Sequence, residues 1–478
     1  MNVMKMMAIV LVMIHMGYAA TNYPVKAFID DLLHVDRQDD NLNLQITMAE
    51  RVYDQAAAIN DWSIAANVAN NYVQPYQNSF FSPKFQEVLS ADLSLRRPFI
   101  TTGGTLSFTT GHQSIRQSAL KDPETGTLYN QPLFYQHTVG IQYVQPLLYG
   151  FLGEHYRYSL RTASQNVAQK TVASQEQFED FLATELTGFV DWTLAYELSE
   201  MAYSRYQLAK ESVSLTKDRA RVNVSEQIDV LRAEYAMQNA LQQWKNQLAL
   251  LKSEQIKMAT RLNKPSLRHV VPTFDLYKTV YVKSPDYIPV STLRRYEILA
   301  LDKDRLDGQL ALSRSKRNGE LNVVAAYTRK MGKPTRSAWT FPNYDTTVGV
   351  SYSRPLADTA AIAAVKKAEM DVTQFENQSY QLTQELKSHM VALHTLVMEY
   401  EALLETTLDQ VTLSQKKATE ENGLYRQGRS PIEMLIQAQD NVLASKINYA
   451  QSSAQYHKYV LMYLSLIDQL TTTYEVSL

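Results

Sequence analysis

Hydrophobic positions recur along the chain with two different periods. In several short segments apolar residues alternate with positions that are mostly small or polar, which is the period of a β-strand with one apolar face. Two much longer segments, 153–217 and 357–425, instead repeat apolar residues every three or four positions, as an α-helix does. The pattern predicts a mixed fold in which strands lead into very long helices. The alternating segments are 88–95, 105–109, 138–144 and 321–328.

The long helical segments carry nearly regular apolar stripes. In the second, the steps from Leu382 to Val411 are 4, 4, 3, 4, 3, 4, 4 and 3 residues, close to a heptad seam. A helix of about 65 residues would be roughly 100 Å long, so it should pack lengthwise against other helices. Other expected helices cover 41–70, 226–262, 290–316 and 431–470, and an irregular connector over 263–290 contains a short element at 274–282.

One ten-residue stretch occurs twice. Residues 138–147 (TVGIQYVQPL) and 347–356 (TVGVSYSRPL) share Thr, Val, Gly, Tyr, Pro and Leu in the same order. Each copy reads as a strand that meets a proline and is followed by a long helix, so Pro146 and Pro355 are expected at two strand–helix junctions. Gly140 and Gly349 fall among the small and polar residues of these strands. The stretch predicts two internal repeats.

Both long helices are interrupted at matching places. The first break is around 219–225, where Asn223 tolerates a left-handed backbone, and Ser225 could cap the next helix. The second is at Gly428, with Pro431 suited to the first turn of the following helix. An alanine follows each break at the same distance, ten residues after Asn223 and ten after Gly428. The order of helix, strands, long helix, turn and helix is therefore expected twice.

Composition narrows the function classes. A net charge of −2 over 478 residues gives no electrostatic case for nucleic acid. The absence of cysteine excludes disulfides, thiol catalysis and Cys-ligated zinc. Lys5, an apolar run over 6–16 and small residues at 17–20 predict a secretory signal peptide, 1–19.

The predicted strands raise a problem of closure. Apolar residues on one face and small or polar residues on the other suit the wall of a water-filled barrel, although a half-solvated hairpin in a soluble protein shows the same alternation. About four strands are expected per chain, and four strands with open edges cannot stand in lipid. Three chains would give twelve strands in a closed ring.

The chain resembles the TolC-type outer-membrane factors. The resemblance rests on the two strand–Pro-Leu junctions and on two turn motifs, 424–439 (LYRQGRSPIEMLIQAQ) and, more faintly, 221–234 (RVNVSEQIDVLRAE). It covers essentially the mature chain. It implies a trimeric transmembrane β-barrel continuous with an α-helical coiled-coil tunnel across the periplasm, which serves as the exit duct of a tripartite efflux pump or a type I secretion system.

The resemblance also implies the site and the partners. The turns would form a periplasmic tip that opens as a gate and docks a periplasmic adaptor and an inner-membrane transporter. Tyr425 matches a tip tyrosine and Asp229 a tip acid, whereas Met434 and Gln437 stand where well-known members carry inward-facing acids. The candidate tip residues are Arg221, Asn223, Asp229, Tyr425, Gly428, Arg429 and Glu433.

The resemblance and the pattern together divide the chain into expected segments. They are 1–19 (signal peptide), 20–86 (N-terminal segment and periplasmic helix), 87–150 (first barrel strands), 151–263 (long helix, tip turn and return helix), 264–290 (equatorial connector), 291–317 (first helix of the second repeat), 318–356 (second barrel hairpin) and 357–478 (long helix, tip turn and C-terminal helix).

No motif suggests an enzyme. The sequence contains no Gly-rich phosphate loop, zinc-protease pair or nucleophile elbow, so no catalytic residue, cofactor or metal is expected. His389 and His394 are five residues apart, not the four that place a metal pair on one helix face. The alternative function is a structural coiled-coil protein of the envelope without a lumen. The exported cargo is not encoded in these patterns.

Overall fold

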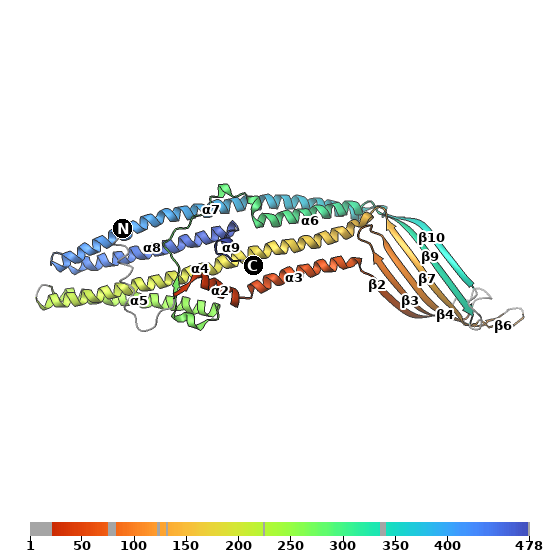
Figure 1. Cartoon of the computed structure of the whole chain (residues 1–478), viewed down its shortest axis with the longest axis horizontal. Coiled ribbons are helices and arrows are strands. Elements are labelled where there is room, and N and C mark those ends of the chain that lie inside the picture. Colours follow the sequence, from red (N-terminus) through yellow and green to blue (C-terminus); the bar gives the residue numbers. More distant parts are fainter. Residues whose placement is uncertain are drawn as a thin grey trace. The chain divides into compact units, whose positions relative to one another are not determined.

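The computed structural model describes residues 22–74, 83–121, 125–130, 132–222, 225–334 and 341–476 (Figure 1). The predicted signal peptide and Asn223 lie outside these residues. The chain divides into two compact units. The sheet unit comprises the described residues of 45–172 and 298–380, and the helical unit comprises those of 1–44, 173–297 and 381–478. Four helices, α3, α4, α6 and α7, contribute residues to both units.

The sheet unit contains one six-stranded sheet in the order β10-β9-β7-β4-β3-β2, with every neighbouring pair antiparallel (Figure 1). A two-residue pair, β5 (Leu120–Lys121) and β6 (Leu128–Tyr129), lies between β4 and β7 in the chain. The six strands are β2 (Ser63–Val73), β3 (Gln86–Pro98), β4 (Thr105–Gln117), β7 (Phe134–Pro146), β9 (Glu320–Pro334) and β10 (Phe341–Ser353).

The prediction of about four strands was wrong, because the sheet has six. The predicted helix over 41–70 was also wrong in its second half. Helix α3 (Gln38–Ala57) ends early, a short 3-10 turn η1 (Ala58–Asn60) follows, and β2 takes up 63–73. Ile64 and Val68 are four residues apart, a spacing that fits one helix face and also one strand face. Pairing with β3 along all eleven residues of β2 decides between the two.

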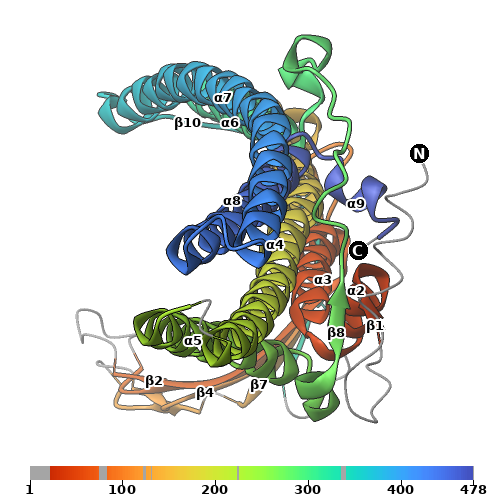
Figure 2. The same ribbon diagram turned by 90° about the vertical axis from the view of Figure 1, so that its left-hand side faces the viewer.

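The helical unit is dominated by two helix–turn–helix segments. Helix α4 (Glu154–Arg221) is followed by α5 (Gln227–Arg261), and α7 (Thr359–Arg426) by α8 (Ile432–Leu466). Both first helices have 68 residues and both second helices 35. The four predicted helices are confirmed to within a few residues at each end. Within the helical unit α5 lies beside α4, and α8 beside α7 (Figure 1 and Figure 2).

Shorter helices complete the fold. The remaining helical elements are α2 (Val25–Val35), α6 (Arg294–Lys316), α9 (Leu470–Thr473) and the 3-10 turns η2 (Phe151–Gly153), η3 (Pro265–His269), η4 (Pro285–Tyr287) and η5 (Val290–Thr292).

The core of the helical unit is rich in aromatic residues. Phe189 and Trp192 of α4 are fully buried and meet edge to face, and Phe28 of α2 packs on Phe189. The residues of the predicted stripe of α7 are buried or half-buried, and most of them belong to this core. Leu408 is an exception and is 46% exposed. The buried stripe residues are Leu386, Met390, Val397, Leu404 and Val411.

The connector over 263–290 is held by hydrogen bonds to its backbone. Its β8 (Val271–Thr273) pairs in parallel with β1 (Asn22–Pro24). The short element predicted at 274–282 does not form. Instead, Tyr456 of α8 accepts a hydrogen bond from the Val280 N–H and donates one to the Val280 carbonyl, both at 3.0 Å. These bonds replace the partners that a strand or helix would supply.

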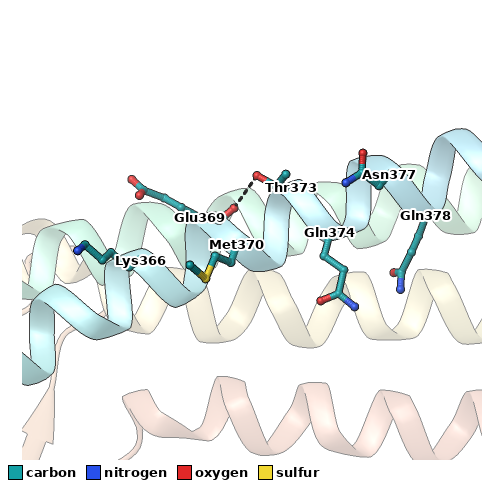
Figure 3. Close-up of a pocket in the computed structure, with 7 residues that line it drawn as sticks. All are labelled: Lys366, Glu369, Met370, Thr373, Gln374, Asn377 and Gln378. Carbon is teal, nitrogen blue, oxygen red and sulfur yellow. Dashed lines mark hydrogen bonds between the residues drawn. The ribbon is translucent and has the colours of Figure 1, made fainter.

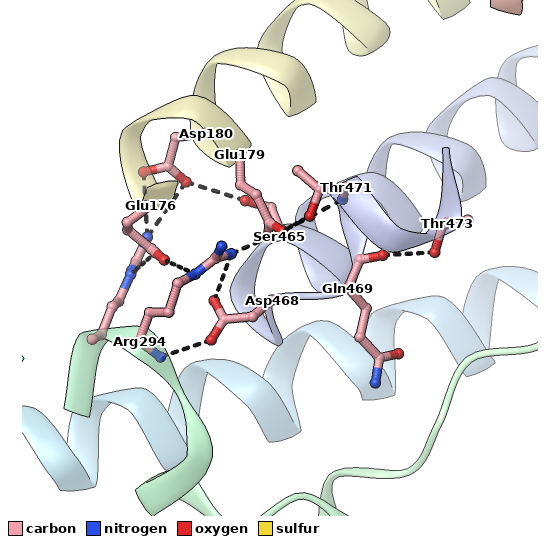
Figure 4. Close-up of polar contacts among 10 residues, drawn as sticks. Glu176, Glu179, Asp180, Arg294, Ser465, Asp468, Gln469, Thr471 and Thr473 are labelled. Atoms are coloured by element: carbon pink, nitrogen blue, oxygen red, sulfur yellow. Dashed lines mark hydrogen bonds and ion pairs between the residues drawn. The ribbon is translucent and has the colours of Figure 1, made fainter. Parts of the chain in front are cut away.

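A buried cluster of charges joins α4, α6 and the segment after α8 (Figure 4). Arg294 lies 2.8 Å from the fully buried Glu179 and 3.2 Å from Asp468, and Thr471 donates to Glu179 at 2.6 Å. Glu176 pairs with Arg295. Burial raises the pKa of the Glu176 carboxyl from 4.5 to about 7, and Arg295 only partly offsets this effect.

We expect Glu176 to make the stability of the helical unit depend on pH. Its folded pKa lies above its unfolded value, so its contribution is fully present below about pH 4.5 and is lost as pH rises through 7. Glu176→Gln should lessen the fall in stability between pH 5 and 8, by on the order of 1 kcal/mol. Thermal unfolding, monitored by circular dichroism across this pH range, measures the change in stability. Glu385→Gln, on an exposed position of α7, is the matched control. Equal pH slopes in wild type and Glu176→Gln would contradict this account.

Candidate functional site

The register of the sheet separates apolar from polar side chains. Residues paired across neighbouring strands point to the same side, and adjacent residues of one strand point to opposite sides. Two adjacent rows across the four central strands illustrate the separation. They are Leu95, Phe108, Ile141, Tyr327 on one side and Ser94, Thr109, Gly140, Thr328 on the other.

The same separation continues over the central part of the strands, and we name the two sides the apolar face and the polar face. The apolar face includes Ile64, Val68, Leu89, Leu93, Val139, Val323, Val348 and Val350. The polar face includes Asn67, Asn71, Ser90, Asp92, Gln113, Gln136, Gln142, Lys330, Asn343, Thr347 and Ser351. A sheet with one apolar and one polar face can separate a nonpolar environment from water.

Gly140 of β7 lies on the polar face between two threonines. A Cβ at this position would come within 2.8 Å of Thr109 Oγ1 and 3.2 Å of Thr328 Oγ1, so glycine leaves room for both hydroxyls. Gly349 of β10 lies on the same face, and a Cβ there would meet no atom within 4 Å. At these two positions no side chain projects from the polar face.

The two predicted junction prolines lie where strands give way to helices. Pro146 is the last residue of β7 and pairs with Asn322 of β9. The chain then turns through Gly150 and Gly153, both at positive φ, before α4 begins at Glu154. Pro355 lies between the end of β10 and the start of α7 at Thr359.

The turns α4–α5 and α7–α8 belong to one unit, and Tyr425 connects them. Its side chain is 2% exposed, and its hydroxyl lies 2.7 Å from Thr216 Oγ1 of α4. The guanidinium of Arg219 lies 4.5 Å from the centre of the Tyr425 ring and donates to the Tyr425 carbonyl. A small core that includes Ile432 and Leu435 surrounds the ring. We call the ends of these four helices, residues 205–240 and 421–440, the tip.

Gly428 allows the sharp turn behind Tyr425. Its φ is +74°, a left-handed conformation that glycine adopts without strain. The Gly428 N–H donates to the Tyr425 carbonyl at 3.0 Å, and the Arg429 N–H donates to the Leu424 carbonyl at 2.9 Å. These two bonds satisfy two of the last four carbonyls of α7.

Asp229 contributes mainly to the start of α5. Glu226 is the N-cap, and the Asp229 carboxylate accepts from the Glu226 N–H at 3.3 Å in a capping box. Ser225, which the sequence suggested as the cap, instead accepts a hydrogen bond from Arg219 Nε at 3.3 Å. Asp229 also lies 3.3 Å from Arg232, whose Nε reaches Glu433 of α8 at 3.1 Å. The structure thus links Asp229 to Glu433 through one arginine.

The remaining candidates lie on the surface. Arg221 pairs with Asp218 on its own helix at 3.1 Å, and Arg429 is exposed. Sequence reasoning missed the pair of Arg205, 3% exposed, with Asp440 at 2.8 Å, and the role of Thr216. No signal in the sequence could have paired these residues, because more than 200 positions separate the partners.

One further hollow in the described residues runs along a single helix. A groove of about 550 Å³ follows α7 over 366–378, and all of its lining side chains come from that one helix (Figure 3). Among the described residues no group of three His, Cys, Asp or Glu side chains is placed to hold a metal. None of the helices in the described part combines the length and the apolar character needed to cross a membrane.

The fold of this chain was compared with those of known proteins. No family model matches the chain, and no curated protein matches its sequence. Among solved structures, the outer membrane protein VceC of Vibrio cholerae matches 92% of this chain and 95% of its own, with a TM-score of 0.64 and 9% identity. The outer-membrane channel OprN matches 92% and 88%, with a TM-score of 0.65 and 13% identity.

A third similar structure is the MtrE outer membrane channel of Neisseria gonorrhoeae. It covers 93% of this chain and 89% of its own, with a TM-score of 0.64 and 12% identity. The likeness extends over nearly the whole of each chain, so it concerns the complete fold. The chain therefore has the fold of the TolC-type outer-membrane channels.

Proposed function

We propose that this chain forms an outer-membrane export channel that works as a homotrimer. The observation that carries the proposal is the register of the sheet, which places apolar side chains on one face and small or polar ones on the other. In the proposal the apolar face meets the acyl chains of the outer membrane, and the polar face lines a water-filled lumen. Gly140 and Gly349 then leave the lumen unobstructed.

The helical unit supplies the second part of the proposal. Its helices line a periplasmic tunnel, and the tip acts as the gate. A periplasmic adaptor and an inner-membrane transporter dock at the tip, in a tripartite efflux pump or a type I secretion system. The contacts of Tyr425 with Thr216 and Arg219 support a closing role, because they join the α4–α5 segment to the α7–α8 segment.

The alternative, a structural coiled-coil protein of the envelope, is less consistent with the sheet. Such a protein has no need for a six-stranded sheet with faces of opposite polarity. Cell fractionation and an unheated denaturing gel distinguish the two functions. We expect the chain in outer membranes as a detergent-resistant oligomer that conducts ions in planar bilayers. A monomer in the soluble fraction would refute the channel.

Two adjacent residues of β7 test the orientation of the sheet. Ile141 lies on the apolar face and Gln142 on the polar face, and both are exposed. Ile141→Arg should destabilise the protein in lipid by about 2–4 kcal/mol if this row is near the bilayer midplane, whereas Gln142→Arg should change stability little and alter ion selectivity. Urea midpoints in lipid vesicles and reversal potentials measure these effects. Equal destabilisation by the two variants would contradict the assignment of faces.

Tyr425→Phe tests the gate. The change removes the hydroxyl contact with Thr216 but keeps the buried ring, so the closed state should lose about 1 kcal/mol and the open fraction should rise roughly fivefold. Adding Asp229→Ala should raise it further. Single-channel recording measures the open fraction, and Tyr235→Phe, at a tyrosine that is 70% exposed, is the matched control. An unchanged open fraction in the double variant would argue against a gate at this position.

A further inference from the structure

The sheet of a single chain has two edges with a partner on one side only. Within the described residues β2 pairs with β3 alone, and β10 pairs with β9 alone, while the four strands between them pair on both sides. All eleven residues of β2 are exposed, and so are the described residues of β10 apart from Gly349. Each edge therefore presents unpaired backbone N–H and C=O groups that need a partner in lipid.

The edges lack the usual protection against association. Soluble proteins guard an edge strand with charged residues, with lysine above all. Strand β2 (SIAANVANNYV) has no charged residue, and β10 (FPNYDTTVGVSYS) has one. That residue, Asp345, pairs with Lys330 of the neighbouring β9 at 2.6 Å. The composition of the two edge strands therefore does not prevent them from pairing with a strand of another chain.

The edges also fit each other in direction. Five successive antiparallel pairings separate β10 from β2, so these two strands run in opposite directions across the sheet. When two copies stand side by side in the same orientation, β10 of one meets β2 of the next as an antiparallel pair. This is the arrangement inside the sheet itself, and it can repeat around a ring.

The side chains at the two edges match as well. On the apolar face β2 presents Ile64 and Val68, and β10 presents Val348 and Val350. On the polar face the edges present amides and hydroxyls. Joining them with like faces aligned extends both faces without a break. The polar residues at the edges are Asn67, Asn71, Asn343, Thr347 and Ser351.

We propose that copies of this chain join β10 to β2, so that all six strands of each chain enter a common barrel. With the three copies of the proposed function, on which this count rests, the barrel has eighteen strands rather than twelve. Barrel diameter grows roughly in proportion to strand number, and barrels of 16–18 strands leave an aqueous channel. The additional strands widen the opening through the membrane.

Engineered disulfides test the pairing, because the natural chain contains no cysteine. Val68→Cys on β2 is combined in turn with cysteine at Tyr344, Thr346, Val348 or Val350 on β10. These positions share the apolar face, and the series covers alternative registers between the two edges. We expect one or two neighbouring combinations to give disulfide-linked dimers and closed trimers on a non-reducing gel.

Two controls use the same strands. Thr347→Cys lies beside Thr346 and Val348 but on the polar face, so its combination with Val68→Cys should not cross-link. Thr110→Cys lies on β4, in the interior of the sheet, and on the apolar face. Its combination with the β10 series should not cross-link either. Single-cysteine variants must reach the outer membrane at the level of wild type.

The outcomes separate this inference from the proposed function. Disulfides between β4 and β10 would show a barrel of four strands per chain and overturn the inference, as would a conducting trimer without β2–β10 disulfides. Native mass spectrometry checks the copy number against the mass of one denatured chain, and a ring of two or four copies would overturn the count of eighteen. A cross-linked ring that does not conduct would refute the channel while the pairing stands.

Discussion

Backbone N–H and C=O groups need hydrogen-bond partners, and this requirement governs the sheet unit, where the four inner strands find them on both sides. The register that these bonds fix decides which side chains share a face, since a slip of one residue would exchange the apolar and polar faces. It places Ile141 beside Phe108 and Tyr327, and Gly140 between two threonines. The same requirement leaves β2 and β10 in need of partners outside the chain.

The helical unit meets a different requirement. Its long helices carry apolar stripes. They bury these stripes against each other and against α2, which removes the apolar surface from water. At one level the packing also includes one arginine and three acidic side chains, with Arg294 among Glu176, Glu179 and Asp468 (Figure 4). Burying an unpaired charge is costly, so this cluster keeps its members together and fixes the start of α6 beside α4.

The tip combines a rigid turn with a contact that can be broken. Gly428 sets the direction of the chain after α7, and the buried Tyr425 ring fills the space between the two helix–turn–helix segments. The polar contacts around the ring are few, and the surface ion pairs nearby contribute little stability. In a channel that opens at this end, such a contact can hold one state without making the other inaccessible.

The sequence by itself determined the local periods. The alternation over 88–95 and 138–144 and the three- and four-residue steps over 153–217 and 357–425 identify strands and long helices, because these periods follow from backbone geometry alone. The breaks around residue 223 and at Gly428 and the two prolines located the ends of these elements.

The tertiary structure decided what depends on distant neighbours. Residues 63–73 could follow either period, and only pairing with β3 makes them a strand, so the strand count of the sheet could not be read from the sequence. Arg294 meets Glu179, and Tyr425 meets Thr216, across more than a hundred residues each. Such contacts arise from the packing of whole helices. The sequence around each residue contains no local pattern that predicts its distant partner.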